Sequence, residues 1–217
     1  MTEIYLVRHC YSLTNDSKLL AGWFDTDISE KGAEQLELLA ERFRDVKLDK
    51  VYVSPLIRAR KTAAAVNKYP QAETIVDERL KELWLGELEC KTVDDMTEEQ
   101  RYAWQYDVTK FHSEGEDPQH AYNRFVEGFL EAAKANDGKT IAIVAHGAVL
   151  RMFACYARGM GLEMYNKING MRNTAVNLIR FSEEKGIEIV FEDDVSHLES
   201  RPDLITSGWK FNPTVNK

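Results

Sequence analysis

Three short segments of the chain are almost continuously apolar, at residues 4–7, 51–53 and 141–145. Runs of this length and character are typical of strands whose two faces are both covered by other parts of a protein. We therefore expect a central, largely parallel sheet.

Helices are expected after these strands, at residues 29–43, 54–69 and 147–160. In the first, Ser29 is a suitable N-cap and apolar residues recur at helical spacing. The second is rich in alanine and carries Pro55 near its start. This alternation of strand and helix predicts an α/β fold.

The later part of the chain differs in pattern. Residues 174–181 and 186–193, joined by a polar turn, are expected to form a hairpin at one sheet edge. Residues 92–136 are acidic, aromatic and mostly helical in spacing, with a second helix around residues 121–135. We interpret them as a helical insertion or lid over a site, although an ordinary core fits the aromatic residues equally well. Residues 196–217 contain two prolines and little periodicity, which predicts an irregular tail.

The composition fits one domain over residues 1–217, with 44% hydrophobic residues. We expect a cytoplasmic protein, because the pattern of a membrane span or a secretory signal is missing. The formal net charge of −8 argues against nucleic acid or an anionic membrane as the main partner. Cys10, Cys90 and Cys155 lack the spacing of a zinc site or a disulfide framework, so we expect reduced thiols.

Basic side chains follow each predicted strand, although the protein is acidic. The first strand ends in Arg8 and His9, the second is followed by Arg58, and the third by His146. A single histidine at a strand end is more often packed or solvated than catalytic. The carboxyl ends of parallel strands meet at one edge of a sheet, however, where ligands bind in such folds. Because basic residues follow all three predicted strands at the same end, we expect them to form one basic pocket.

A pocket of this kind suits a phosphate dianion. Guanidinium groups match phosphate oxygens and keep their charge, so neither a metal ion nor a cofactor is needed to neutralise the ligand. A neutral imidazole is a competent nucleophile toward phosphorus and forms a phosphohistidine. The leaving oxygen needs an acid, and the apolar neighbours of Glu82 are of the kind that raise a carboxyl pKa. By pattern alone Glu82 is only modestly preferred over Glu78, Glu87 and Glu89.

Several motifs in a fixed order carry a family resemblance. Residues 8–15, RHCYSLTN, correspond to an Arg-His-Gly-x-Thr-x-x-Asn opening. Further matches are Gly22-Trp23, Asp27-Ile28-Ser29 with Gly32 and Gln35, Ser54-Pro55-Leu56 with Arg58 and Thr62, Leu80 with Glu82 and Gly86, Gly115-Glu116, His146-Gly147 with Arg151, and the region up to Asn173-Thr174. In these residues the chain resembles the histidine phosphatase superfamily, also called phosphoglycerate-mutase-like, and together the motifs are highly specific.

The resemblance implies a three-layer α/β/α sandwich and metal-independent phosphoryl transfer. His9 would be the nucleophile and Glu82 the proton donor. Arg8, Asn15, Arg58 and His146 would bind the phosphate group.

Two residues depart from the family pattern. Cys10 replaces the usual glycine after the nucleophile, and Tyr11 stands where a glutamate is common. We expect Cys10 to fill space; a redox-sensitive role would require thiolate character. A cysteine nucleophile is disfavoured, because no cysteine has an arginine at the Cys-x-x-x-x-x-Arg spacing of that chemistry.

The favoured function is a phosphomonoesterase acting on a small phosphorylated metabolite. The first alternative is a phosphoglycerate-type mutase, but such mutases follow their acid with a basic, polar run, whereas residues 83–85 are Leu-Trp-Leu. The second alternative is a non-catalytic phospho-binding regulatory domain, which the intact basic quartet disfavours. The sequence leaves the identity of the substrate and the oligomeric state open.

Overall fold

The structure, a computed structural model, describes residues 1–207. A six-stranded sheet in the order β3-β2-β4-β1-β5-β6 forms its centre. The four strands β1 to β4 run parallel to one another, and β5 is antiparallel to both β1 and β6. The strands are β1 (Thr2–Arg8), β2 (Lys50–Val53), β3 (Glu73–Val76), β4 (Thr140–Ala145), β5 (Val176–Ser182) and β6 (Gly186–Asp194).

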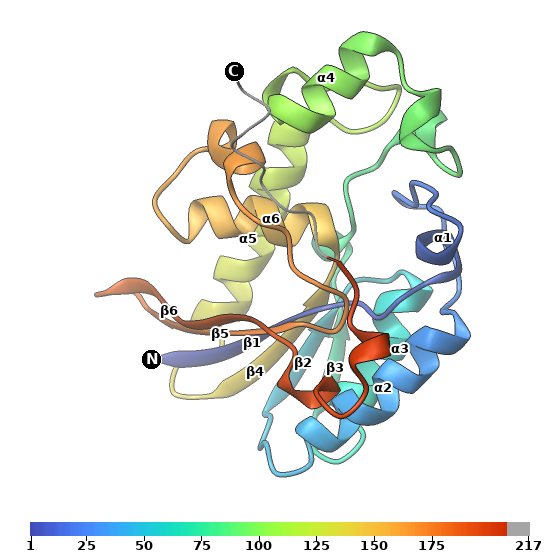
Figure 1. Ribbon diagram of the computed structural model, residues 1–217. Coiled ribbons are helices and arrows are strands. Elements are labelled where there is room, and N and C mark those ends of the chain that lie inside the picture. Colours follow the sequence, from blue (N-terminus) through green and yellow to red (C-terminus); the bar gives the residue numbers. More distant parts are fainter. Residues whose placement is uncertain (208–217) are drawn as a thin grey trace.

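Helices cover both faces of the sheet and make a three-layer sandwich, as expected (Figure 1). One face carries α2 (Glu30–Arg42) and α3 (Ile57–Val66), and the other carries α5 (Pro118–Lys134) and α6 (Gly147–Tyr156). The remaining helices are α1 (Leu13–Asp16) and α4 (Glu98–Tyr106). Single 3₁₀ segments lie at Glu78–Leu80, Gly86–Leu88, Val93–Asp95, Val108–Lys110, Leu162–Lys167, Ser196–Leu198 and Pro202–Leu204.

The continuous apolar runs of the sequence reflect this two-sided covering. In β4, Ile141 and Ile143 belong to the core beneath α5 and α6, while Ala142 and Val144 belong to the core beneath α2 and α3. Successive side chains of a strand point to opposite faces, so a central strand needs apolar residues at every position. The hydrophobic cores on the two faces of the sheet therefore both include residues of β4.

The predicted helices and the hairpin are present. Ser29 caps α2 by accepting a hydrogen bond from the Gly32 N–H at 3.1 Å, and β5 and β6 form the expected hairpin. Strand β3 was not predicted. It is a four-residue edge strand whose residues are mostly exposed, so its sequence lacks the apolar run that marks the central strands.

The stretch at residues 92–136 has two different environments. Helix α5 packs on the sheet, with Phe125 and Phe129 fully buried in the core. Helix α4 instead lies beyond the end of the sheet, at the top of Figure 1. Its Tyr102 side chain is 60% exposed, whereas Phe111, just after it, is buried.

The segment at residues 196–207 runs along α2 and is tied to it. Leu198 and Leu204 are buried, and the Gln35 side chain donates to the Leu204 carbonyl at 2.8 Å. Residues 208–217 of the predicted tail lie outside the described residues. Within residues 1–207, no helix is long and apolar enough to cross a membrane.

His197, in this segment, should make the free energy of unfolding depend on pH. Its Nε2 lies 3.2 Å from the Thr174 hydroxyl, and burial lowers the pKa of His197 to about 4. In the unfolded chain the ring titrates near pH 6.5, so between about pH 6.5 and 4 the unfolded state binds more protons. The free energy of unfolding therefore falls as the pH falls through this window, by up to about 1.4 kcal/mol per pH unit for this one group.

We expect His197→Gln to reduce this pH dependence in urea unfolding measured at several pH values between 7 and 5. The exposed His112 is the control position, where His112→Gln shows what the loss of a surface histidine does to the slope. An identical slope in wild type and His197→Gln would contradict the assignment.

Candidate functional site

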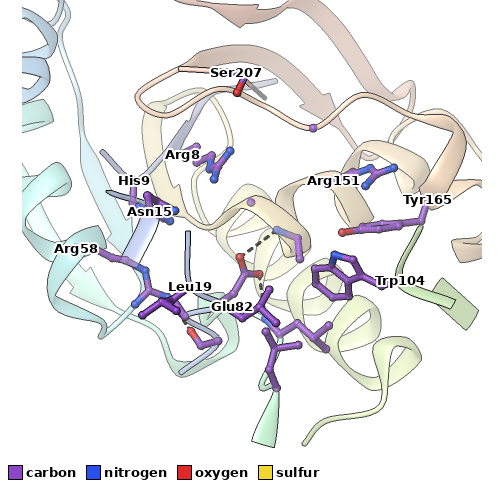
Figure 2. A pocket seen from close by; sticks show the side chains of 18 residues that line it. Arg8, His9, Asn15, Leu19, Arg58, Glu82, Trp104, Arg151, Tyr165 and Ser207 are labelled. Atoms are coloured by element: carbon purple, nitrogen blue, oxygen red, sulfur yellow. Dashed lines mark hydrogen bonds between the residues drawn. The ribbon is translucent and has the colours of Figure 1, made fainter. Parts of the chain in front are cut away.

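A cavity of about 250 Å³ opens where β1, β2 and β4 end. It brings together side chains that lie far apart in the sequence (Figure 2). Five of the six predicted site residues line it: Arg8, His9, Asn15, Arg58 and Glu82. The sixth, His146, is fully buried beside His9, with ring centroids 5.1 Å apart.

The two arginines of the cavity are held by backbone carbonyl groups. Arg58, only 1% exposed, donates to the carbonyl oxygens of Phe24 at 3.0 Å and Gly22 at 2.7 Å. Arg8 donates to the Met171 carbonyl. Removal from water lowers the pKa of both guanidinium groups, and the Glu82 carboxylate opposes this shift. Arginine keeps its charge under such conditions, so the cavity is positively charged.

A glycine makes room for Arg8. A Cβ atom on Gly147, the first residue of α6, would lie 3.2 Å from the Arg8 guanidinium carbon. Such a contact is tighter than side chains normally make, so the absence of a side chain at Gly147 lets the guanidinium lie against the start of the helix.

The His9 ring is neutral and has a defined tautomer. Its Nδ1 lies 2.7 Å from the Cys10 carbonyl oxygen, which can only accept, so Nδ1 carries the hydrogen and Nε2 a free lone pair. Burial lowers the pKa of His9 well below its usual value, and the positive charges of Arg58 and Arg8 lower it further. An unprotonated nitrogen is therefore present at neutral pH.

His146 directly follows β4 and contacts Ser54, which directly follows β2. Its Nε2 lies 2.7 Å from the Ser54 hydroxyl. Burial lowers the pKa of His146 well below its usual value, and Arg58 adds to the shift. The cluster thus contains two neutral imidazole rings beside two guanidinium groups.

The Glu82 carboxylate lies at the N-terminus of α6. It accepts hydrogen bonds from the backbone N–H groups of Leu83 at 3.0 Å, Ala148 at 3.1 Å and Val149 at 3.2 Å. Its surroundings are thus more polar than its sequence neighbours suggested. The competing Glu78 forms a salt bridge with Lys81 on the surface, at 2.6 Å. Among the described residues, Glu82 is the carboxylate that lines this cavity.

Asn15 is oriented by the short helix α1. Its side-chain oxygen accepts from the Ser12 N–H at 3.2 Å and from the Asn173 amide at 3.4 Å. Because the oxygen is engaged by these donors, the amide NH₂ is the group of Asn15 that remains for a ligand.

Asn173 supports the site, a role that was not predicted from the sequence. It is buried, and its amide donates to the His9 carbonyl at 3.0 Å. Thr206 in turn donates to the Asn173 side-chain oxygen at 3.1 Å. The amino- and carboxyl-terminal parts of the chain therefore meet behind His9. A lone asparagine has no periodic signal, and the resemblance to known motifs marked only its position.

Cys10 points away from the cavity. Its sulfur lies 3.3 Å from the place where a Cβ on Gly32 would be, at the contact with α2. Burial raises the pKa of the Cys10 thiol to about 11, so it is not a thiolate at neutral pH. Tyr11 uses its hydroxyl to donate to the Asn15 carbonyl at 3.1 Å. Both departures from the family pattern therefore make packing or hydrogen-bond contacts.

Comparison with known families identifies the chain. The sequence model of the histidine phosphatase superfamily (branch 1) matches residues 4–194. The chain belongs to this superfamily. It is a phosphoric monoester hydrolase.

Relatives of this histidine phosphatase span nearly its whole length. Phosphoserine phosphatase 1 of Hydrogenobacter thermophilus is 31% identical over 193 residues, covering 86% of this chain and 90% of that protein. The probable phosphoglycerate mutase GpmB of Escherichia coli O1:K1 is 27% identical, covering 92% and 96%. Among solved structures, YhfR of Bacillus stearothermophilus has a TM-score of 0.85 at 29% identity, covering 92% and 100%.

The orientation of Cys10 predicts a mild effect of its replacement. Cys10→Gly should leave the turnover of an aryl phosphate within about tenfold of wild type, which is about 1.4 kcal/mol of barrier. Cys155→Ala, which alters another buried thiol, is the matched control. A much larger loss in a Cys10→Gly protein that melts as a folded domain would show that the thiol takes part in the reaction.

Proposed function

We propose that this protein hydrolyses a small phosphorylated metabolite, without a metal ion, through a phosphohistidine on His9. The observation that carries the proposal is the tautomer of His9. The ring donates from Nδ1 to the Cys10 carbonyl and is neutral, so Nε2 is available to attack phosphorus.

In this proposal Arg8, Arg58, Asn15 and His146 bind the phosphate group. The guanidinium groups supply the positive charge that phosphoryl transfer requires, and backbone carbonyls already orient them before the ligand arrives. Within residues 1–207, no group of three or more His, Cys, Asp or Glu side chains is arranged as metal ligands would be.

Glu82 acts as the proton donor in the first step. The His9 Nε2 forms a bond to phosphorus while the P–O ester bond breaks, and the Glu82 carboxyl group gives its proton to the leaving oxygen. In the second step Glu82 takes a proton from water, which attacks the phosphohistidine and releases phosphate. His9 returns to its neutral form, so atoms and charges balance over the cycle.

Two features favour hydrolysis over a mutase reaction. The residues after Glu82 are apolar, and Leu83 and Leu85 line the cavity. The named phosphoserine phosphatase is more similar to this chain than the mutase described above, at 31% against 27% identity. O-phosphoserine is therefore the first substrate to test.

His9→Ala should abolish the covalent route. After rapid mixing of wild-type protein with a ³²P-labelled substrate and quenching, we expect an acid-labile, base-stable phosphoprotein, and none in His9→Ala, because its nucleophile is missing. His120→Ala, at an exposed position, is the matched control.

All reactions in this experiment contain EDTA. Label that persists in His9→Ala would overturn the assignment of the nucleophile. Activity that disappears in EDTA and returns with magnesium or zinc would overturn the metal-independent mechanism.

Glu82→Gln should slow substrates according to their leaving group. An alkyl phosphate such as O-phosphoserine has a poor leaving group and should lose roughly 10²- to 10⁴-fold in turnover. An activated aryl phosphate hardly needs a proton on its leaving oxygen, so its phosphorylation step should lose much less. The ratio of the two losses, measured by single-turnover kinetics, is the diagnostic.

Glu78→Gln is the matched control for this variant, because Glu78 lies on the surface. Both Glu82 oxygens accept from backbone N–H groups, so the side-chain amide that Glu82→Gln introduces leaves one donor facing another donor. Thermal melting must therefore show that the variant is folded. Equal losses for both leaving groups would move the acid role to another carboxylate.

A further inference from the structure

Arg151 lines the cavity but has no role in the proposed reaction. It lies on α6 four residues after Gly147, which is about 6 Å further along the helix axis. Figure 2 shows Arg151 and Tyr165 on one side of the cavity, with His9 and Arg58 on the opposite side. Arg151 therefore faces the part of the cavity that the leaving group would occupy.

The Arg151 side chain is held in a fixed place. Its Nε donates to the Ile168 carbonyl at 2.8 Å, and its guanidinium carbon lies 4.0 Å above the centre of the Tyr165 ring. The side chain is nearly buried, and Trp104 of α4 lies on the same side of the cavity. A planar cation held in this way is well suited to recognise a planar anion.

The charges around the cavity indicate which ligand fits. The charged side chains that line it within the described residues are Arg8, Arg58, Arg151 and Glu82. With Glu82 protonated as the acid, three positive charges face the substrate. A phosphate dianion balances two of them, and a single carboxylate balances the third.

We propose that Arg151 binds a carboxylate of the substrate, so that the enzyme selects small phosphomonoesters that carry one carboxylate close to the phosphate ester. This inference rests on the proposed function. Phosphoserine and phosphoglycerate, which occur in the names of the relatives, both have this group. The two ligands share the chemistry that Arg151 recognises and differ in an ammonium or a hydroxyl group.

Matched substrate pairs test the inference in the wild-type protein. O-phosphoserine is compared with O-phosphoethanolamine, and 3-phosphoglycerate with glycerol 3-phosphate, because the second member of each pair lacks the carboxylate. We expect kcat/KM to be at least roughly tenfold higher for the carboxylated member of one or both pairs. The pair with the larger difference identifies the source of the carboxylate. Equal kcat/KM values within both pairs would overturn the inference.

Variants then assign the preference to Arg151. Arg151→Met should lower kcat/KM for the preferred carboxylated substrate by roughly 10- to 100-fold. The value for its partner without a carboxylate should change less than about threefold, so the selectivity disappears. Arg151→Lys should restore part of it. Arg158→Met is the matched control, because Arg158 pairs with Glu192 and does not line the cavity.

The outcomes separate the inference from the proposed function. An equal loss for both members of a pair in Arg151→Met would mean that Arg151 only supports the fold, and would overturn the inference. If Arg151→Met does not fold, Arg151→Lys and the wild-type pairs decide. Hydrolysis of an aryl phosphate without any preference for a carboxylate would leave the proposed function intact and refute the inference. A wild-type protein inactive on every phosphomonoester would refute both.

Discussion

The site depends on buried positive charge that, within the described residues, is held by carbonyl oxygens rather than by salt bridges. Carbonyl oxygens of Gly22, Phe24 and Met171 orient the Arg58 and Arg8 guanidinium groups. Carbonyl groups satisfy the N–H donors but carry no net charge, so the field of the two cations remains available to an anion. The same field, together with burial, keeps His9 neutral. One arrangement thus prepares both the proposed phosphate pocket and the proposed nucleophile.

Loops that are distant in the sequence supply these contacts. The loop before β5 provides the Met171 carbonyl for Arg8 and the Asn173 amide for the His9 carbonyl. Thr206 holds Asn173, and the segment containing Thr206 is tied to α2. Ser207, the next residue, lines the cavity. The last described residues are therefore part of the scaffold that fixes the end of the first strand.

The sequence predicted the parts of the molecule that follow a repeating physical rule. Central strands must be apolar on both faces, so β1, β2 and β4 could be recognised, and parallel strands bring the residues at their carboxyl ends together. This convergence explains why the basic cluster could be anticipated. The exposed edge strand β3 follows no such rule. Contacts such as Asn173 with His9 join single polar residues 164 positions apart, and no local pattern encodes them. His146 follows the same strand-end rule as Arg8 and His9, and its ring is fully buried directly beside His9.

Contacts from α5 and from the loop before it hold the backbone around Glu82. Arg124 of α5 donates to the carbonyl oxygens of Arg79, Lys81 and Glu82, and it forms a salt bridge with Glu116 at 2.7 Å. A Cβ atom on Gly115 would lie 2.2 Å from the Trp84 carbonyl oxygen, so only glycine allows the two loops to approach this closely.

The stretch from α4 to the start of α5 therefore has two tasks. Through Glu116 and Gly115 it holds the backbone beside Glu82, and through Trp104 it forms a wall of the cavity. The first task constrains this segment tightly, because a shift of the Glu82 backbone would move its carboxylate away from the N–H groups of α6. Trp104, in contrast, packs against Phe111, with ring centroids 5.1 Å apart. The residues that position the Glu82 backbone are thus different from the residue that forms this wall of the cavity.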